Sequence, residues 1–88
     1  NGRVALVTGA GTGIGRAVAV ALAAAGAGVG IHYHTSADGA KEALASFPRP
    51  EAGLLVQGDL SDEQAASAVV DAVVARFGRL DVVVNNAG

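Results

Sequence analysis

The 88-residue sequence contains no cysteine, no methionine and no tryptophan, and only 3% of its residues are aromatic. Without cysteine, the sequence supplies no disulfide and no cysteine-ligated metal site. It has no apolar run of the roughly 18 residues that a membrane span requires, and no charged-then-apolar signal peptide. Its net charge of −2 and its scattered basic residues argue against a nucleic-acid-binding face. We therefore expect a cytoplasmic protein that binds neither membranes nor nucleic acids.

What the sequence does contain is small and apolar residues in alternating strand and helix patterns. Hydrophobic residues make up 51% of the chain, and alanine supplies much of that share. Short apolar runs predict buried strands at 3–8, 29–34, 54–58 and 81–85. Three- and four-residue periodicity predicts helices at 14–25, from a cap at Thr35 or Ser36 to about Phe47, and from Ser61 to Gly78. This alternation predicts an α/β fold: a partial, Rossmann-like doubly wound parallel sheet with strand order 3-2-1-4.

Local signals add detail to two of the helices and to the end of the chain. The first helix has an apolar stripe made of Ile14, Val18, Ala21, Leu22 and Ala25. In the last helix, Ser61 and Gln64 have the spacing of a capping box with Ser61 at the N-cap. Because the chain stops directly after a strand, we expect a single segment over residues 1–88 that is truncated at its C-terminal end.

A glycine-rich turn at residues 8–15 joins the first strand to the first helix. Glycine lets backbone amides approach a ligand closely, and the following helix directs its positive end at the turn, so the site favours an anion such as phosphate. The standard G-x-G-x-x-G fingerprint does not fit, because Ile14 and Arg16 stand where its last glycine belongs. The spacing that fits is T-G-x-x-x-G-x-G, from Thr8 to Gly15.

Two other interpretations of the turn remain open. The glycines alone would also allow strand and helix to pack tightly without a ligand. The frame Gly9-x-Gly11-x-Gly13 resembles the nucleotide turn of S-adenosylmethionine-dependent methyltransferases. Those enzymes carry acidic residues at positions that hold Val7 and Tyr33 here, which argues against this second interpretation.

Three motifs in order resemble the N-terminal part of the classical short-chain dehydrogenase/reductases. They are the glycine turn at 8–15, Asp59-Leu60 after the third strand, and residues 85–88, Asn-Asn-Ala-Gly, after the fourth. The resemblance covers all 88 residues but only the front part of the family's fold, and it implies that this chain is an NAD(P)-binding segment. It implies an NAD(P)(H)-dependent oxidoreductase of which this chain supplies the dinucleotide-binding half. The alternative is a non-catalytic nucleotide-binding module or a folding fragment.

The resemblance also implies a role for each motif residue. It places Gly9, Thr12, Gly13 and Ile14 around the pyrophosphate and the adjoining ribose. Gly15 would permit close packing of the helix on the strand. Asp59 would bond the adenine amino group, with Leu60 beside the ring. The residues that border the adenosine ribose and lead toward the nicotinamide would be Asn86, Ala87 and Gly88. For Asp59, an exposed loop carboxylate without a ligand is the other interpretation, and the two asparagines would in either case tie neighbouring loops together.

The end of the second strand indicates which nicotinamide cofactor is bound. Enzymes specific for NAD(H) usually place Asp or Glu there to bond the ribose 2′-OH, but this position holds Tyr33. His34 can share a proton, and the Thr35 and Ser36 hydroxyls can donate to a 2′-phosphate, so NADP(H) is favoured over NAD(H). Against this, many NADP(H) enzymes of the family have a basic residue where Thr12 stands. The stretch 32–37 also resembles the pteridine-reductase branch of the family.

The family's catalytic residues are absent from this sequence. That chemistry uses a Ser and a Tyr with a Lys four positions later, because a phenol needs a nearby cation to work at neutral pH. The only tyrosine and the only lysine are Tyr33 and Lys41, eight positions apart. We therefore predict no catalytic residue and no metal ligand here, although His32 and His34 on one side of a strand leave a metal site as an alternative. The longer protein is expected to be a homo-oligomer that acts on a small carbonyl or alcohol substrate.

Overall fold

A computed structural model describes residues 2–86, and strands and helices alternate along them as the sequence predicts. The elements are β1 (Val4–Val7), α1 (Gly13–Ala24), β2 (Gly28–Tyr33), α2 (Ala37–Ala45), the short 3₁₀ helix η1 (Pro50–Ala52), β3 (Gly53–Gln57), α3 (Glu63–Phe77) and β4 (Val82–Val84). Gly78, in the left-handed conformation, ends α3 where the sequence predicts. The predicted order of strands and helices is confirmed.

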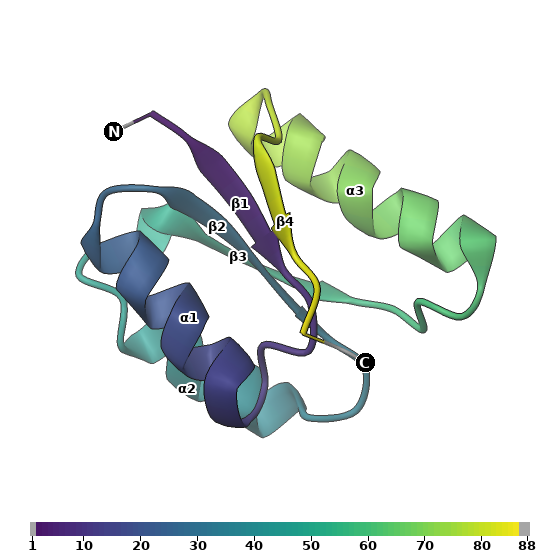
Figure 1. Ribbon diagram of the computed structural model, residues 1–88, viewed down its shortest axis with the longest axis horizontal. Coiled ribbons are helices and arrows are strands. Elements are labelled where there is room, and N and C mark those ends of the chain that lie inside the picture. Colours follow the sequence, from purple (N-terminus) through teal and green to yellow (C-terminus); the bar gives the residue numbers. More distant parts are fainter. Residues whose placement is uncertain (1, 87–88) are drawn as a thin grey trace.

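The four strands form one parallel sheet in the order β3-β2-β1-β4, which confirms the predicted 3-2-1-4 arrangement (Figure 1). β1 pairs with β2 on one side and with β4 on the other, so that Val7 lies between Ile31 and Val84. Because all four strands run in the same direction, the segments that follow β1, β2, β3 and β4 lie at the same end of the sheet. That end is where doubly wound folds bind their ligands.

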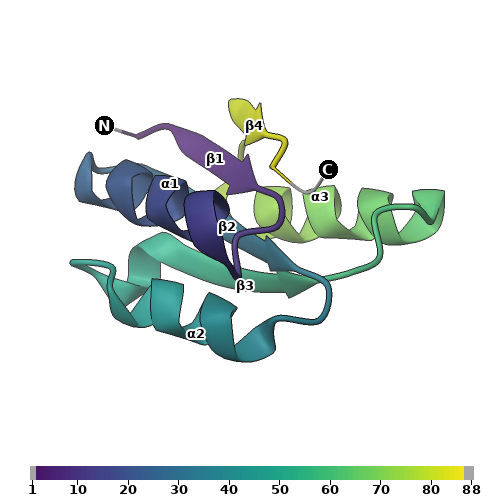
Figure 2. The ribbon, with the colours of Figure 1, turned by 60° about the horizontal axis from the view of Figure 1, so that its bottom comes forward.

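Helices cover both faces of the sheet, with α1 and α2 on one face and α3 on the other (Figures 1 and 2). Alternate residues of each strand therefore belong to two separate apolar cores. The core under α1 and α2 contains Val7, Ala19, Ala23, Val29, Ile31, Ala40, Ala43 and Phe47, among others. The core under α3 contains Val4, Leu6, Val56, Val69 and Val73.

The predicted apolar stripe of α1 is wrong in part. The buried residues of α1 are Gly15, Ala19 and Ala23, with Val18 and Leu22 half-buried beside them. Ile14 is 75% exposed, and Ala21 and Ala25 are also exposed. The helix turns its smallest side chains toward the sheet, which lets its backbone lie close to the strands. Branched residues at these positions would hold the helix farther away.

The predicted N-cap of α3 is also wrong by one residue. Asp62 is the N-cap, and its Oδ1 accepts a hydrogen bond of 3.0 Å from the Gln64 N–H. The Ser61 hydroxyl instead donates to Asp59 Oδ1 at 2.7 Å. Asp59 therefore engages the serine, and the next residue that can cap begins the helix.

β4 lies at an open edge of the sheet. Its outer side has no strand partner among residues 2–86, and Val82 and Val83 are 45% and 53% exposed. Across the same residues, none of the helices has the length and apolarity needed to cross a membrane.

Candidate dinucleotide-binding site

Hydrogen bonds attach the glycine turn to the segment that follows β4. The N–H of the buried Thr8 donates to the Val84 carbonyl at 3.0 Å. Its hydroxyl oxygen accepts a bond of 2.9 Å from the Asn86 N–H and lies 3.3 Å from Asn85 Oδ1. Two motifs that are 70 or more positions apart in the sequence are thus brought into direct contact.

Gly15 and Asn86 pack against the backbone of Gly9. The Asn86 Nδ2 donates to the Gly9 carbonyl at 3.2 Å. A Cβ atom on Gly15 would lie 2.5 Å from that carbonyl oxygen and 2.5 Å from Asn86 Nδ2. Any side chain at position 15 would therefore push the first turn of α1 away from the end of β1.

The N-terminus of α1 has the features of an anion-binding site. The helix begins at Gly13 after the N-cap Thr12, whose side chain makes no capping hydrogen bond within the described structure. Its first turn has no acidic residue, so no carboxylate of that turn competes for the first-turn N–H groups. These N–H groups and the helix dipole favour a phosphate. Ile14, largely exposed, stands at the mouth of this turn.

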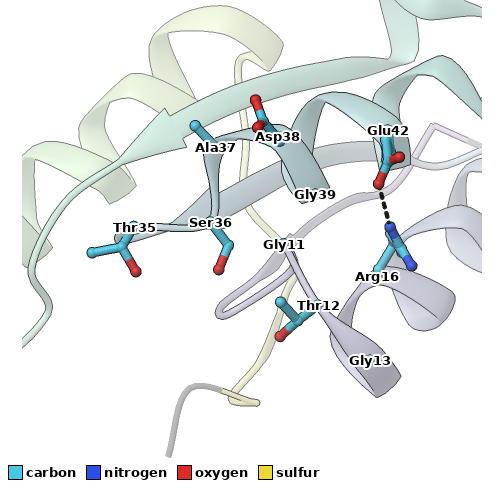
Figure 3. Close-up of a pocket in the computed structure, with 10 residues that line it drawn as sticks. All are labelled: Gly11, Thr12, Gly13, Arg16, Thr35, Ser36, Ala37, Asp38, Gly39 and Glu42. Atoms are coloured by element: carbon cyan, nitrogen blue, oxygen red, sulfur yellow. Dashed lines mark hydrogen bonds and ion pairs between the residues drawn. The ribbon is translucent and has the colours of Figure 1, made fainter.

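A pocket of about 390 Å³ extends from the glycine turn to the start of α2 (Figure 3). It is lined by Gly11, Thr12, Gly13, Arg16, Thr35, Ser36, Ala37, Asp38, Gly39 and Glu42. Two close approaches shape it. A Cβ atom on Gly11 would lie 2.6 Å from the Ser36 carbonyl oxygen, and one on Gly39 would overlap the Gly11 carbonyl.

The pocket presents hydroxyl groups on one side. Ser36 is the N-cap of α2, as predicted, but its hydroxyl makes no capping bond within the described chain. In Figure 3 the Thr35 and Ser36 hydroxyls point toward the side of Thr12, whereas the Asp38 carboxylate points away. Three neutral donors therefore face one region, and the nearest carboxylate of α2 is turned from it.

Arg16 supplies the pocket's positive charge and was missed by the sequence analysis. Its guanidinium forms an ion pair of 2.8 Å with Glu42 of α2, with the Arg16 side chain 42% exposed and the Glu42 side chain 71% exposed (Figure 3). The available signal was a basic residue directly after the last glycine of the turn. The sequence does not show that Arg16 lines a pocket, because its partner Glu42 lies 26 positions later on another helix.

Asp59 follows β3 at the same end of the sheet and is exposed. Its Oδ1 accepts hydrogen bonds from the Ser61 hydroxyl and, at 3.0 Å, from the Ser61 N–H. These bonds lower the pKa of the Asp59 carboxyl below its usual value of 3.8, which keeps it ionised and able to accept at neutral pH. Leu60 is half-buried against the core under α3.

The two histidines of β2 and its end have different environments. His32 is 2% exposed, with one ring nitrogen 3.0 Å from the Gly9 nitrogen and the other 2.8 Å from the Gly58 carbonyl oxygen. Both nitrogens are engaged by backbone groups, so the ring offers none to a metal. His34 is exposed and does not line the pocket of Figure 3. Ala87 and Gly88 of the last motif lie outside the described residues.

A sequence model of the family described as short chain dehydrogenase matches residues 3–88. The chain belongs to this family. The crystal structure of the apo form of glucose dehydrogenase of Caenorhabditis elegans is similar to this chain, with a TM-score of 0.92 and 32% sequence identity. That alignment covers 99% of this chain and 38% of the other.

Curated relatives agree with the family match. Glucose 1-dehydrogenase 2 of Bacillus subtilis is 36% identical over 99% of this chain and 34% of its own length. The human 15-hydroxyprostaglandin dehydrogenase [NAD(+)] is 47% identical over 100% of this chain and, again, 34% of its own length. This chain therefore spans about a third of the length of these curated relatives.

Proposed function

We propose that this chain is the dinucleotide-binding half of an NAD(P)(H)-dependent oxidoreductase that acts on a carbonyl or alcohol substrate. The observation that supports it best is the position of three groups at one end of the sheet. These are the uncapped N-terminus of α1, the hydroxyl-lined pocket and the ionised Asp59. A bound nicotinamide cofactor would supply or accept hydride, while this chain's residues hold its adenosine and pyrophosphate groups.

Each part of the cofactor has a candidate partner. The pyrophosphate would lie on the first-turn N–H groups of α1, and the adenine amino group would bond the Asp59 carboxylate. The full set of proposed binding residues is Gly9, Thr12, Gly13, Ile14, Gly15, His34, Thr35, Ser36, Asp59, Leu60, Asn86, Ala87 and Gly88.

We further propose a preference for NADP(H) over NAD(H). Family membership does not decide this, because one relative's name specifies NAD(+). The support comes from the end of β2, where Tyr33 replaces the carboxylate that would repel a 2′-phosphate. Among the described residues the Ser36 hydroxyl makes no capping bond and can donate, and Arg16, which pairs with Glu42, is a cation at the pocket wall.

Titration calorimetry with NADP⁺ and NAD⁺ on the same protein sample tests both proposals. We expect NADP⁺ to bind more tightly, and raised salt to weaken NADP⁺ binding more than NAD⁺ binding, because the extra phosphate is held by charge and hydrogen bonds. Equal affinities would contradict the NADP(H) preference alone. Binding of neither dinucleotide would contradict the proposed function itself.

The second candidate, a binding module without catalysis, is favoured for the isolated chain. Tyr33 packs against the core under α1 and α2, and Lys41 lies on the exposed side of α2, so neither forms the paired phenol and cation that the chemistry needs. We expect residues 1–88 alone to bind the cofactor without turnover. Steady NADPH oxidation by this chain across a panel of aldehydes and ketones would contradict that expectation. Homo-oligomeric assembly and a cytoplasmic location stay predictions.

A further inference from the structure

The buried imidazole of His32 connects two backbone segments of the site. Its Nδ1 lies 3.0 Å from the Gly9 nitrogen, and its Nε2 lies 2.8 Å from the Gly58 carbonyl oxygen. The Gly9 N–H can only donate, so Nδ1 must accept, and the Gly58 carbonyl can only accept, so Nε2 must carry the proton. These two partners select one neutral tautomer of the ring.

The ring joins the two segments that, in the proposed function, hold the pyrophosphate and the adenine of the cofactor. Gly9 begins the pyrophosphate turn, and Gly58 directly precedes Asp59, the proposed adenine partner. The main chain of His32 adds a third contact, because its carbonyl accepts a bond of 2.7 Å from the Ala10 N–H. A single residue of β2 thus binds the segments that follow both neighbouring strands.

The contact with Gly9 also fixes the conformation of the turn. Gly9 has a φ of +63°, which places its N–H toward β2 and its carbonyl toward Asn86. His32 holds the N–H, and Asn86 holds the carbonyl at 3.2 Å. Without the imidazole, the partly buried Gly9 N–H would lose its present acceptor, and Gly9 would keep only the bond from Asn86 to its carbonyl.

We propose that His32 is a positioning residue of the dinucleotide site, which sets the pyrophosphate turn and the adenine-binding segment in fixed register. This inference rests on the proposed function and extends it to a residue that never touches the cofactor. A ligand that spans both segments gains from their being preorganised, whereas a ligand that contacts only one segment gains little. This difference separates positioning from a purely structural role of a buried residue.

The test compares two ligands on four variants. NADP⁺ spans the turn and the adenine segment, whereas adenosine 2′-phosphate lacks the pyrophosphate and does not span them. His32→Leu removes both ring contacts, His32→Asn keeps an acceptor near the Nδ1 position, and His32→Gln keeps a donor near the Nε2 position. Val29→Ala is the matched control, because Val29 is a fully buried residue of the same strand in the core under α1 and α2.

We expect His32→Leu to weaken NADP⁺ binding about tenfold or more, as loss of a buried hydrogen-bond partner predicts. Adenosine 2′-phosphate should lose much less affinity, and His32→Asn should recover NADP⁺ affinity that His32→Gln does not. Val29→Ala should lower the melting temperature yet leave the ratio of the two ligands' affinities as in the wild type.

Three outcomes would overturn the inference while leaving the proposed function standing. The first is NADP⁺ affinity in His32→Leu within about twofold of wild type, a difference too small for a lost buried contact. The second is an equal loss for both ligands. The third is an affinity ratio in Val29→Ala that changes as much as in His32→Leu. Should His32→Leu not fold, equal NADP⁺ affinities of the Asn and Gln variants would overturn it. Failure of the wild type to bind NADP⁺ and NAD⁺ would instead reject the proposed function.

Discussion

Gly39 of α2 lies directly against the carbonyl of Gly11, so close that a Cβ atom at position 39 would overlap that oxygen. This contact brings the first turn of α2 onto the glycine turn and forms one wall of the pocket in Figure 3. In a helix, glycine is ordinarily less favourable than alanine by about 1 kcal/mol. The structure requires it here because no side chain fits.

The first prediction concerns this contact. Gly39→Ala should destabilise the chain by about 1–3 kcal/mol, because overpacking outweighs the gain in helix propensity. Urea unfolding of the variant measures the change. Comparison of Lys41→Ala with Lys41→Gly, at an exposed position inside the same helix, gives the propensity effect alone. Stabilisation by Gly39→Ala would show that α2 can move away from the turn at no cost.

The second prediction concerns cofactor choice. Tyr33→Asp should lower the affinity for NADP⁺ relative to NAD⁺ by about tenfold or more, because a carboxylate repels the 2′-phosphate and accepts from a free 2′-OH. The ratio of the two affinities is measured on one variant, so any loss of stability affects both ligands alike. Tyr33→Phe is the control and should leave the ratio unchanged. An unchanged ratio in Tyr33→Asp would place the 2′-position of the ribose elsewhere.

The third prediction concerns Asp81, which connects the starts of β1 and β4. Its Oδ2 accepts from the Val4 N–H at 2.8 Å, and its Oδ1 pairs with Arg79. The Arg79 hydrogen bonds, followed by the Val4 bond, lower the pKa of the Asp81 carboxyl below its usual 3.8. A carboxyl with a lowered folded-state pKa stabilises the fold above its unfolded-state pKa, and that contribution disappears as the pH falls through the folded-state value.

Asp81→Asn should therefore be less stable than the wild type at neutral pH, and the two should converge in strong acid. Unfolding in urea across this range of pH measures the difference. Asp71→Asn, on the exposed side of α3, controls for the loss of one negative charge. A difference between wild type and Asp81→Asn that does not depend on pH would mean that the charge of Asp81 contributes nothing.

The fourth prediction concerns the open edge of β4. Isolated residues 1–88 should self-associate, because the exposed side chains of Val82 and Val83 border unpaired backbone groups. Val83→Lys should reduce this association in sedimentation velocity, since a charge on an edge strand opposes pairing. Ala68→Lys adds the same charge to the exposed side of α3 and should have little effect. A monomeric wild-type chain would contradict the prediction.

Strand order and the approximate positions of the elements could be predicted from the sequence, because they follow from local pattern and from rules of chain connection. Each predicted strand bound differs from the observed one by one residue. Apolar runs such as 82–84 and the glycine at 78 are local signals. Packing of α1 was harder to predict, because hydrophobicity favours Ile14 at the interface whereas the space available favours Ala19 and Ala23. The cap of α3 was misplaced since Ser61 and Asp62 can both cap, and only the competing bond to Asp59 decides between them.

The motifs of the candidate site could be found in the sequence, but the residues that support them could not. His32 acts through Gly9 and Gly58, which lie 23 and 26 positions away, so no local pattern connects the three. Arg16 and Gly39 likewise have their partners on another helix or in another loop. Such roles depend on tertiary distances, which a single sequence does not contain.

The position of β1 between β2 and β4 has a consequence for synthesis. β2 follows β1 after one helix, but the Thr8 hydroxyl receives its bond from Asn86, 78 positions later. Closing so long a loop costs entropy before the contact forms, and contacts between distant residues slow folding. On the ribosome, the turn proposed to bind the cofactor would therefore be bonded to β2 alone until nearly all of this chain has emerged.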